Sequence, residues 1–283
     1  MNRLSIPNRI ALTGAVLCLV MGIFVLAGWW FDIPAFRSLV EETGYMKPNS
    51  AIAFALLGAA LWISVPGPIE GRRCYGVWFC IGLAGCIGAM TFAEYFLGAG
   101  LGIDELLVED YLHRPETAAG RMSLLSTVGF TLAAVGLGLL QSHQPSVWRP
   151  TAAGLLACLI ASLAVFSASG IFLDLPTAYD GEDGRQMSLR TAIGLTVLAI
   201  AFVALAHERS RLGGQLVVRW LPFAVGMGVV TLSVLFWQAV RLQERKQIRR
   251  TVLRAATNVQ NLVSAELQSR ILTLIRVARR WEN

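Results

Sequence analysis

A nine-residue stretch occurs three times in the chain, as MKPNSAIAF at 46–54, MSLLSTVGF at 122–130 and MSLRTAIGL at 187–195. The three copies match in kind at every fourth position counted from the Met. These positions hold, in order, the Met, a residue with a hydroxyl group, a bulky apolar residue and a small residue. These positions are Met46, Ser50, Phe54 and Gly58, then Met122, Ser126, Phe130 and Ala134, then Met187, Thr191, Leu195 and Ala199. Residues four apart lie on one side of a helix, so each copy predicts a helix with one packing face.

Each copy follows a polar loop and opens an apolar run of roughly 20 residues, the length that crosses a bilayer core. The apolar segments are seven in all, at about 10–30, 49–65, 75–98, 123–141, 151–172, 188–206 and 218–240. Short connections make consecutive segments antiparallel neighbours, so the motif opens the second helix of each of three tandem hairpins. A pseudo-three-fold bundle and a linear array of hairpins both fit this pattern.

The predicted fold is all-α. A polytopic membrane domain covers 1–240, with internal repeats starting near 46, 122 and 187, and a long extramembrane amphipathic helix covers 241–283. The composition agrees, because 55% hydrophobic residues, 15% charged residues and a mean hydropathy of +0.59 exceed what a soluble domain carries.

Charge and cysteine content limit the partners. The net charge is +6, but the basic residues border apolar segments without the spacing of a nucleic-acid-binding motif, so we expect the lipid bilayer and no nucleic acid. The five cysteines form no CxxC pair and have no companion His at ligand spacing. They predict apolar filler within helices, and we expect no metal and no cofactor.

The distribution of Lys and Arg favours a cytoplasmic N-terminus, because the loops on that side carry more of them. Seven spans then place the C-terminal helix outside the cytoplasm. The basic residues that directly follow the last span, beginning with Arg241 and Arg245, argue for the opposite side. Charge alone leaves the topology open.

The C-terminal helix carries a seam for pairing. Residues 238–281 contain neither Gly nor Pro, and apolar residues recur there at alternating spacings of four and three with one phase break. This pattern predicts a homodimer through the 241–283 helix. Because Asn283 comes with no capping signal, we expect the chain to be a fragment of a longer protein.

Several stretches of the chain resemble parts of a known protein family. The stretches GYMKPNSAIAF (44–54), GIDELL (102–107) with GRMS (120–123), and MSLRTA (187–192) resemble the multi-span N-terminal region of bacterial sensor histidine kinases and diguanylate cyclases. Residues 221–282 are similar to the last span and opening helix of a CHASE-type extracytoplasmic sensor domain. The resemblance implies a location in a bacterial inner membrane, an extracytoplasmic tail, and an eighth span and an output domain beyond Asn283. The chain departs from the family at Arg190, where the third motif is expected to have His.

Candidate sites are few. Glu94 lies near the outer end of the third span, where an ionisable group is a candidate proton or cation sensor or simply faces headgroups. The hydroxyls of Ser50, Ser126 and Thr191 could line a cavity for an unknown small ligand, but packing between helices is the favoured interpretation. The two acidic outer loops lack calcium-loop spacing and are interpreted as solvated faces; their carboxylates are Asp104, Glu105, Glu109, Asp110, Asp174, Asp180, Glu182 and Asp183.

The leading hypothesis is a membrane-embedded sensory input module of a bacterial signalling receptor, which passes a signal across the membrane to an output domain outside these residues. The sequence contains no P-loop, no nucleotide-binding glycine box and no His in the tail. Any enzyme activity therefore belongs to the rest of the parent protein. We expect the parent to be a histidine kinase, with a diguanylate cyclase as the second candidate. The alternative is a stand-alone small transporter or permease-like protein. A third possibility makes the tail a cytoplasmic coiled coil that docks a partner.

Overall fold

A computed structural model describes residues 5–38, 44–66, 71–98, 100–105, 108, 110, 119–141, 146, 148–172, 187–212, 221–222, 224–241, 243–244, 248, 260 and 264. The chain divides into two units, Met1–Phe236 and Trp237–Asn283. Of the second unit, the structure describes only the end of one helix and a few helical residues, including Ile248 and Ser264. The apolar seam predicted over 241–283 therefore lies largely outside the described residues.

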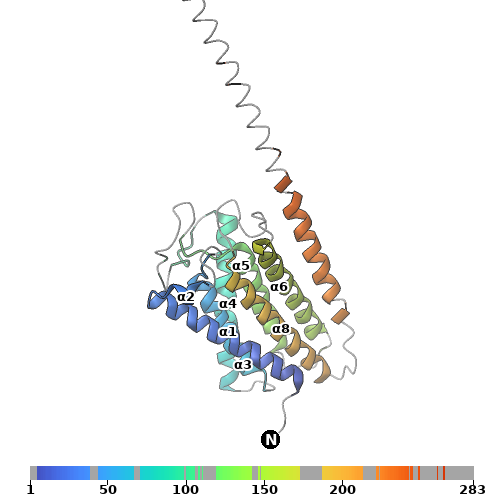
Figure 1. Cartoon of the computed structure of the whole chain (residues 1–283). Coiled ribbons are helices and arrows are strands. Elements are labelled where there is room, and N and C mark those ends of the chain that lie inside the picture. Colours follow the sequence, from blue (N-terminus) through green and yellow to red (C-terminus); the bar gives the residue numbers. More distant parts are fainter. Residues whose placement is uncertain are drawn as a thin grey trace, which may run out of the picture. The chain divides into compact units, whose positions relative to one another are not determined.

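The described residues form helices and turns, and no strand occurs among them. The helices are α1 (Ile6–Trp30), α2 (Pro34–Arg37), α3 (Pro48–Ser64), α4 (Arg72–Leu97), α5 (Leu124–Leu140), α6 (Trp148–Phe172), α8 (Leu189–Leu212) and a further helix, Ala224–Arg241 (Figure 1). Five of them, α1, α4, α6, α8 and Ala224–Arg241, are long and apolar enough to cross a membrane, and α3 and α5 are apolar helices of 17 residues. The chain is a multi-pass membrane protein, and the all-helical prediction is confirmed.

Most helix boundaries lie within a few residues of the predicted ones, and local chemistry explains them. Pro48 occupies the first turn of α3, where its missing N–H costs nothing. Ser123 caps α5 by accepting a hydrogen bond from the Ser126 N–H, and Gly98 ends α4 with a φ of +64°. The end of α8 was predicted too early, because the charged residues after 206 look like a loop. Ser210 is in fact buried against the bundle.

Three motif helices form the centre of the first unit. The helices α3, α5 and α8 contact one another, and each gap between two of them is covered on the outside by a third helix. Helix α1 lies against α3 and α8, α4 against α3 and α5, and α6 against α5 and α8. The six helices thus form a closed ring with pseudo-three-fold symmetry, the arrangement that the sequence left open beside a linear array.

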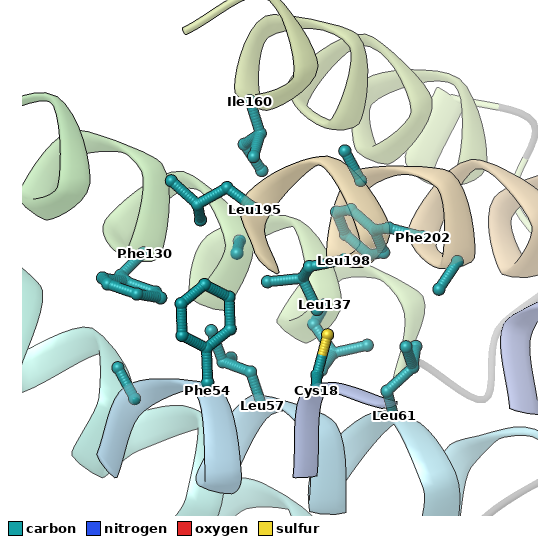
Figure 2. Packing of buried hydrophobic residues seen from close by; sticks show 14 of the residues in the cluster. Cys18, Phe54, Leu57, Leu61, Phe130, Leu137, Ile160, Leu195, Leu198 and Phe202 are labelled. Atoms are coloured by element: carbon teal, nitrogen blue, oxygen red, sulfur yellow. The ribbon is translucent and has the colours of Figure 1, made fainter. Parts of the chain in front are cut away.

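The repeated motif builds the core in layers. All four repeated positions are buried in all three copies. Figure 2 shows the bulky layer, where Phe54, Phe130 and Leu195 converge from the three inner helices. The two phenyl rings meet edge to face with centroids 4.8 Å apart. A Cβ on Gly194 would lie 2.7 Å from the Phe54 ring, so the absence of a side chain there makes room for it.

The outer helices approach the inner ones through small residues. A Cβ on Gly22 would lie 2.5 Å from the carbonyl oxygen of Ala51, and one on Gly88 would lie 2.7 Å from the Thr131 hydroxyl. Ala51 and Thr131 belong to the α3 and α5 partners of α1 and α4. Between helices in a bilayer, such close contact supplies the van der Waals attraction that holds them together.

The outer helices also repeat, which the sequence analysis missed. Six buried positions coincide when α1, α4 and α6 are aligned on Gly22, Gly88 and Ala164. The aligned buried sets are Ala11, Ala15, Cys18, Gly22, Val25 and Gly28 in α1, Val77, Ile81, Ala84, Gly88, Thr91 and Glu94 in α4, and Ala153, Ala157, Ile160, Ala164, Ser167 and Gly170 in α6. In this alignment Glu94 takes a position that is glycine in the other two hairpins.

The helix Ala224–Arg241 packs on α6. The Ser162 hydroxyl donates a hydrogen bond of 2.8 Å to the carbonyl oxygen of Gly228, and the rings of Phe166 and Phe236 lie 5.3 Å apart. Much of the rest of this helix is exposed and apolar, as a lipid-facing span requires.

Glycine packing gives a direct test of the ring. Replacing Gly88 by Ala places a methyl group against Thr131 Oγ1 and the Thr127 carbonyl, so we expect the unfolding temperature in detergent to fall, with a cost of about 1–3 kcal/mol. The control is Gly82→Ala in the same helix, where nothing lies within 4 Å of the added atom. The control should be neutral or slightly stabilising, and an equal loss in both variants would contradict the packing.

Candidate functional site

The candidate site lies at the end of the bundle where the three motif copies begin, here called the motif end and marked by Met46, Met122 and Met187. Its first element is Glu94, in the last turn of α4, whose side chain is fully buried. One carboxylate oxygen, Oε1, accepts a hydrogen bond from the Leu101 N–H. This bond is possible because Gly98 turns the chain back over the helix end.

Arg121 connects Glu94 to a second carboxylate. Its Nε donates a hydrogen bond of 2.8 Å to Asp104 Oδ2 and lies 3.4 Å from Glu94 Oε2. The guanidinium lies over the Tyr95 ring, 5.9 Å from its centroid, and the Tyr95 hydroxyl donates to the carbonyl oxygen of Met122. Two buried carboxylates thus share one cation directly before the second motif copy.

A second ion pair lies beside the first. Lys47, from the first motif copy, pairs with Asp110, whose side chain is buried. Asp110 Oδ2 also accepts a hydrogen bond of 2.8 Å from the Gly120 N–H, and the Asp110 N–H donates to Glu105 Oε1 at 2.9 Å. The first and second hairpins are therefore joined by charge at the motif end.

Burial of these carboxylates corrects the solvated acidic face expected of this loop. Asp104 and Asp110 are 8% and 1% exposed, whereas Glu105 is exposed as expected. Burial raises the pKa of Asp104 to about 6, against the hydrogen bond from Arg121 that lowers it, and the nearby Glu94 adds to the rise. Glu109 and the acidic residues of the third outer loop lie outside the described residues.

In the first and third motif copies, the third position after the Met reaches across to another hairpin. Asn49 donates through Nδ2 to the carbonyl oxygens of Ile103 and Asp104, at 3.1 and 3.3 Å. Arg190 donates to the carbonyl oxygens of Phe36, Ala35 and Ser38, the last two at 3.0 and 3.2 Å.

The first hairpin thus holds a loop of the second, and the third hairpin holds a loop of the first. Lys47 is the N-cap of α3, and Asn49, in the first turn of that helix, makes this contact. The second motif copy has Leu125 at this position, and its apolar side chain cannot donate such a hydrogen bond.

The repeated hydroxyls are part of the helix starts. Ser126 and Thr191 lie 2.7 and 2.8 Å, oxygen to oxygen, from the hydroxyls of Ser123 and Ser188, one turn earlier. Ser50 is buried at the same level of α3. These contacts account for two of the three hydroxyls by local hydrogen bonding, in keeping with the packing interpretation.

The opposite end of the bundle carries a second polar cluster that the sequence analysis did not identify. Gln141 Nε2 donates to the Ser64 hydroxyl at 3.0 Å, and Arg209 donates to the Ser64 carbonyl at 2.8 Å. Asn8 Nδ2 lies 3.4 Å from Glu208 Oε1. This cluster joins the inner helices of all three hairpins. Because its residues lie in or next to apolar segments and do not repeat, no sequence pattern indicated it.

In the part of the chain that the structure describes, no three His, Cys, Asp or Glu side chains gather as ligands of a metal ion. Of the three histidines, the structure describes only His207, on α8. Comparisons with models of protein families, with curated proteins and with solved structures find no match to this chain. Its function is therefore inferred from the geometry of the bundle and its ends.

The turn before Arg121 provides a test of the site. Gly120 has a φ of +69°, and a Cβ there would collide with the Asp104 carbonyl oxygen. We expect Gly120→Ala to displace Asp104 and to lower the free energy of unfolding by at least about 2 kcal/mol more than Gly102→Ala does. Gly102 is the control, because its φ of +76° is similar but nothing lies within 4 Å. Equal losses in thermal unfolding would show that strain alone, and not contact with Asp104, explains the effect.

Proposed function

We propose that this chain is a membrane-embedded sensory input module of a bacterial signalling receptor. The observation that carries the proposal is the separation of polar and apolar layers along the bundle. Polar and charged groups gather at its two ends, and the described core between them is filled by the inner helices' side chains, among them Leu57, Phe54, Phe130 and Leu195 (Figure 2). A bundle built this way can receive a signal at one end and pass it on as movement of helices.

The contacts at the motif end supply a mechanical route for such movement. Asn49 and Arg190 each hold a loop of another hairpin by hydrogen bonds to its backbone. A displacement of one loop is therefore passed to the helix that holds it. The helix Ala224–Arg241 rests on α6 and continues into the second unit, which is the route by which the bundle would reach an output domain. A few kcal/mol between two packings suffices for a two-state switch.

The alternative, a small transporter, finds less support in the described core. Transporters place their substrate and ion sites near the membrane midplane, on broken helices or intramembrane charges. Here the described inner helices are unbroken, and the charged residues named above lie in the loops and end turns.

The finer parts of the proposal come from the sequence. The resemblance supports an extracytoplasmic tail that opens a CHASE-like domain in the bacterial inner membrane, and the distribution of Lys and Arg favours a cytoplasmic N-terminus. The apolar seam supports a homodimer through 241–283. The parent would be a sensor histidine kinase, with a diguanylate cyclase as runner-up.

A reporter cysteine tests topology and signalling together. With the five native cysteines replaced, Ser264→Cys, at an exposed position of the tail, should react with a membrane-impermeant thiol reagent in intact cells and should form disulfides between two copies. Arg121→Gln, which breaks the shared ion pair, should change the disulfide rate several-fold. The matched control is Arg72→Gln, an exposed residue at the start of the same hairpin.

Protection of the reporter thiol in intact cells, with labelling after lysis, would place the tail in the cytoplasm and reject the CHASE-like assignment. Equal disulfide rates in the Arg121 and Arg72 variants, at equal protein levels and unfolding temperatures, would reject transmission from the motif end.

A further inference from the structure

Among the described residues, charge is out of balance in the buried cluster at the motif end. Lys47 and Asp110 neutralise each other, but Glu94 and Asp104 share a single cation, Arg121. With both carboxyls ionised, this group of three carries one uncompensated negative charge. Burying an unpaired charge is costly, so the cluster favours uptake of one positive charge.

The hydrogen bonding has a matching gap. Glu94 Oε2 and Asp104 Oδ1 are both buried, and neither accepts a hydrogen bond among the described residues. Each belongs to a carboxyl group whose other oxygen is bonded, Glu94 to the Leu101 N–H and Asp104 to Arg121. One added proton would remove the excess charge and supply the missing donor.

We propose that Glu94 and Asp104 form a proton-responsive pair, in which one shared proton holds the 100–105 segment against the end of α4. This inference rests on the proposed function, for which it names the stimulus. The absence of a three-ligand cluster in the described residues favours a proton over a metal ion. The charged and titratable groups around the pair, within the described residues, are Arg121, Tyr95, Lys47, Asp110 and Glu105.

The sign of the pH effect follows from Asp104. Its pKa is raised from 3.8 to about 6, so the folded protein binds this proton more tightly than an unfolded chain does. The pair therefore adds stability that is fully present below about pH 4 and is lost as the pH rises through about 6. Above that pH both carboxylates repel each other, and the 100–105 segment loosens from Glu94 and Arg121.

The experiment compares full-length wild type with Asp104→Asn and Glu94→Gln in lipid nanodiscs from about pH 4 to about pH 7.5, a range that brackets the pKa of Asp104. Both amides keep an acceptor oxygen for the existing hydrogen bonds but cannot share a proton in this way. We expect a protonated-carboxyl band in the infrared spectrum of the wild type that titrates near pH 6 and is lost in both variants. The unfolding temperature of the wild type should fall more steeply with rising pH than that of either variant. The control Glu244→Gln, at an exposed carboxylate outside the cluster, should behave as wild type.

Identical titration in wild type and both variants would overturn the proposal. If one variant fails to fold, the other variant and the infrared titration of the wild type still test the proposal. Disulfide formation by the Ser264→Cys reporter over the same pH range separates this inference from the proposed function. If the pair titrates but the disulfide rate of the tail reporter does not change with pH, the sensory role alone is rejected. If the disulfide rate changes with pH in Asp104→Asn as much as in the wild type, the proton pair alone is rejected.

Discussion

Close contact between small residues determines how this bundle is built. In a bilayer the surroundings of a helix are as apolar as its neighbours, so helices associate through tight packing and not through burial from water. Gly58 allows α3 to approach the α1 backbone so closely that an added Cβ would lie 2.6 Å from the Leu19 nitrogen. Gly14 does the same for α1 and α8, where the Cβ of Ala201 would be 2.5 Å away. The positions of the inner helices, and of the loops that cross their ends, depend on these contacts.

The sequence predicted the inner half of the fold well. A helix whose every fourth residue repeats in kind has one buried face, and the structure buries that face in all three copies. The outer repeat was not visible in the sequence, because equivalent buried positions hold residues as different as Gly28 and Glu94. Lipid-facing apolar residues, such as Ile23 in α1, also lie between the buried positions of each helix. Apolar residues on both sides of a membrane helix remove the amphipathic signal on which sequence reasoning depends.

The candidate site was predicted only in part. Glu94 was identified because an ionisable group near an apolar span is unusual, and the structure does bury it. Asp104 and Asp110 were interpreted as solvated, because acidic loops normally are. Their partners explain the difference, since Arg121 follows Asp104 by 17 positions and Lys47 precedes Asp110 by 63. Pairing over such distances is decided by the packing of the hairpins and leaves no local pattern in the sequence.

The closed ring has a consequence for how the chain assembles during synthesis. Membrane proteins emerge N-terminus first, so α1 enters the bilayer long before α8, yet α1 packs on α8 and the Cys18 thiol lies 3.9 Å from the Gly194 carbonyl oxygen. Until the third hairpin inserts, the face of α1 that carries Gly14 and Cys18 is covered by lipid, and the core around Phe54 has only two of its three sides. The bundle therefore becomes complete in a single late step, in which α6 and α8 close two interfaces at once.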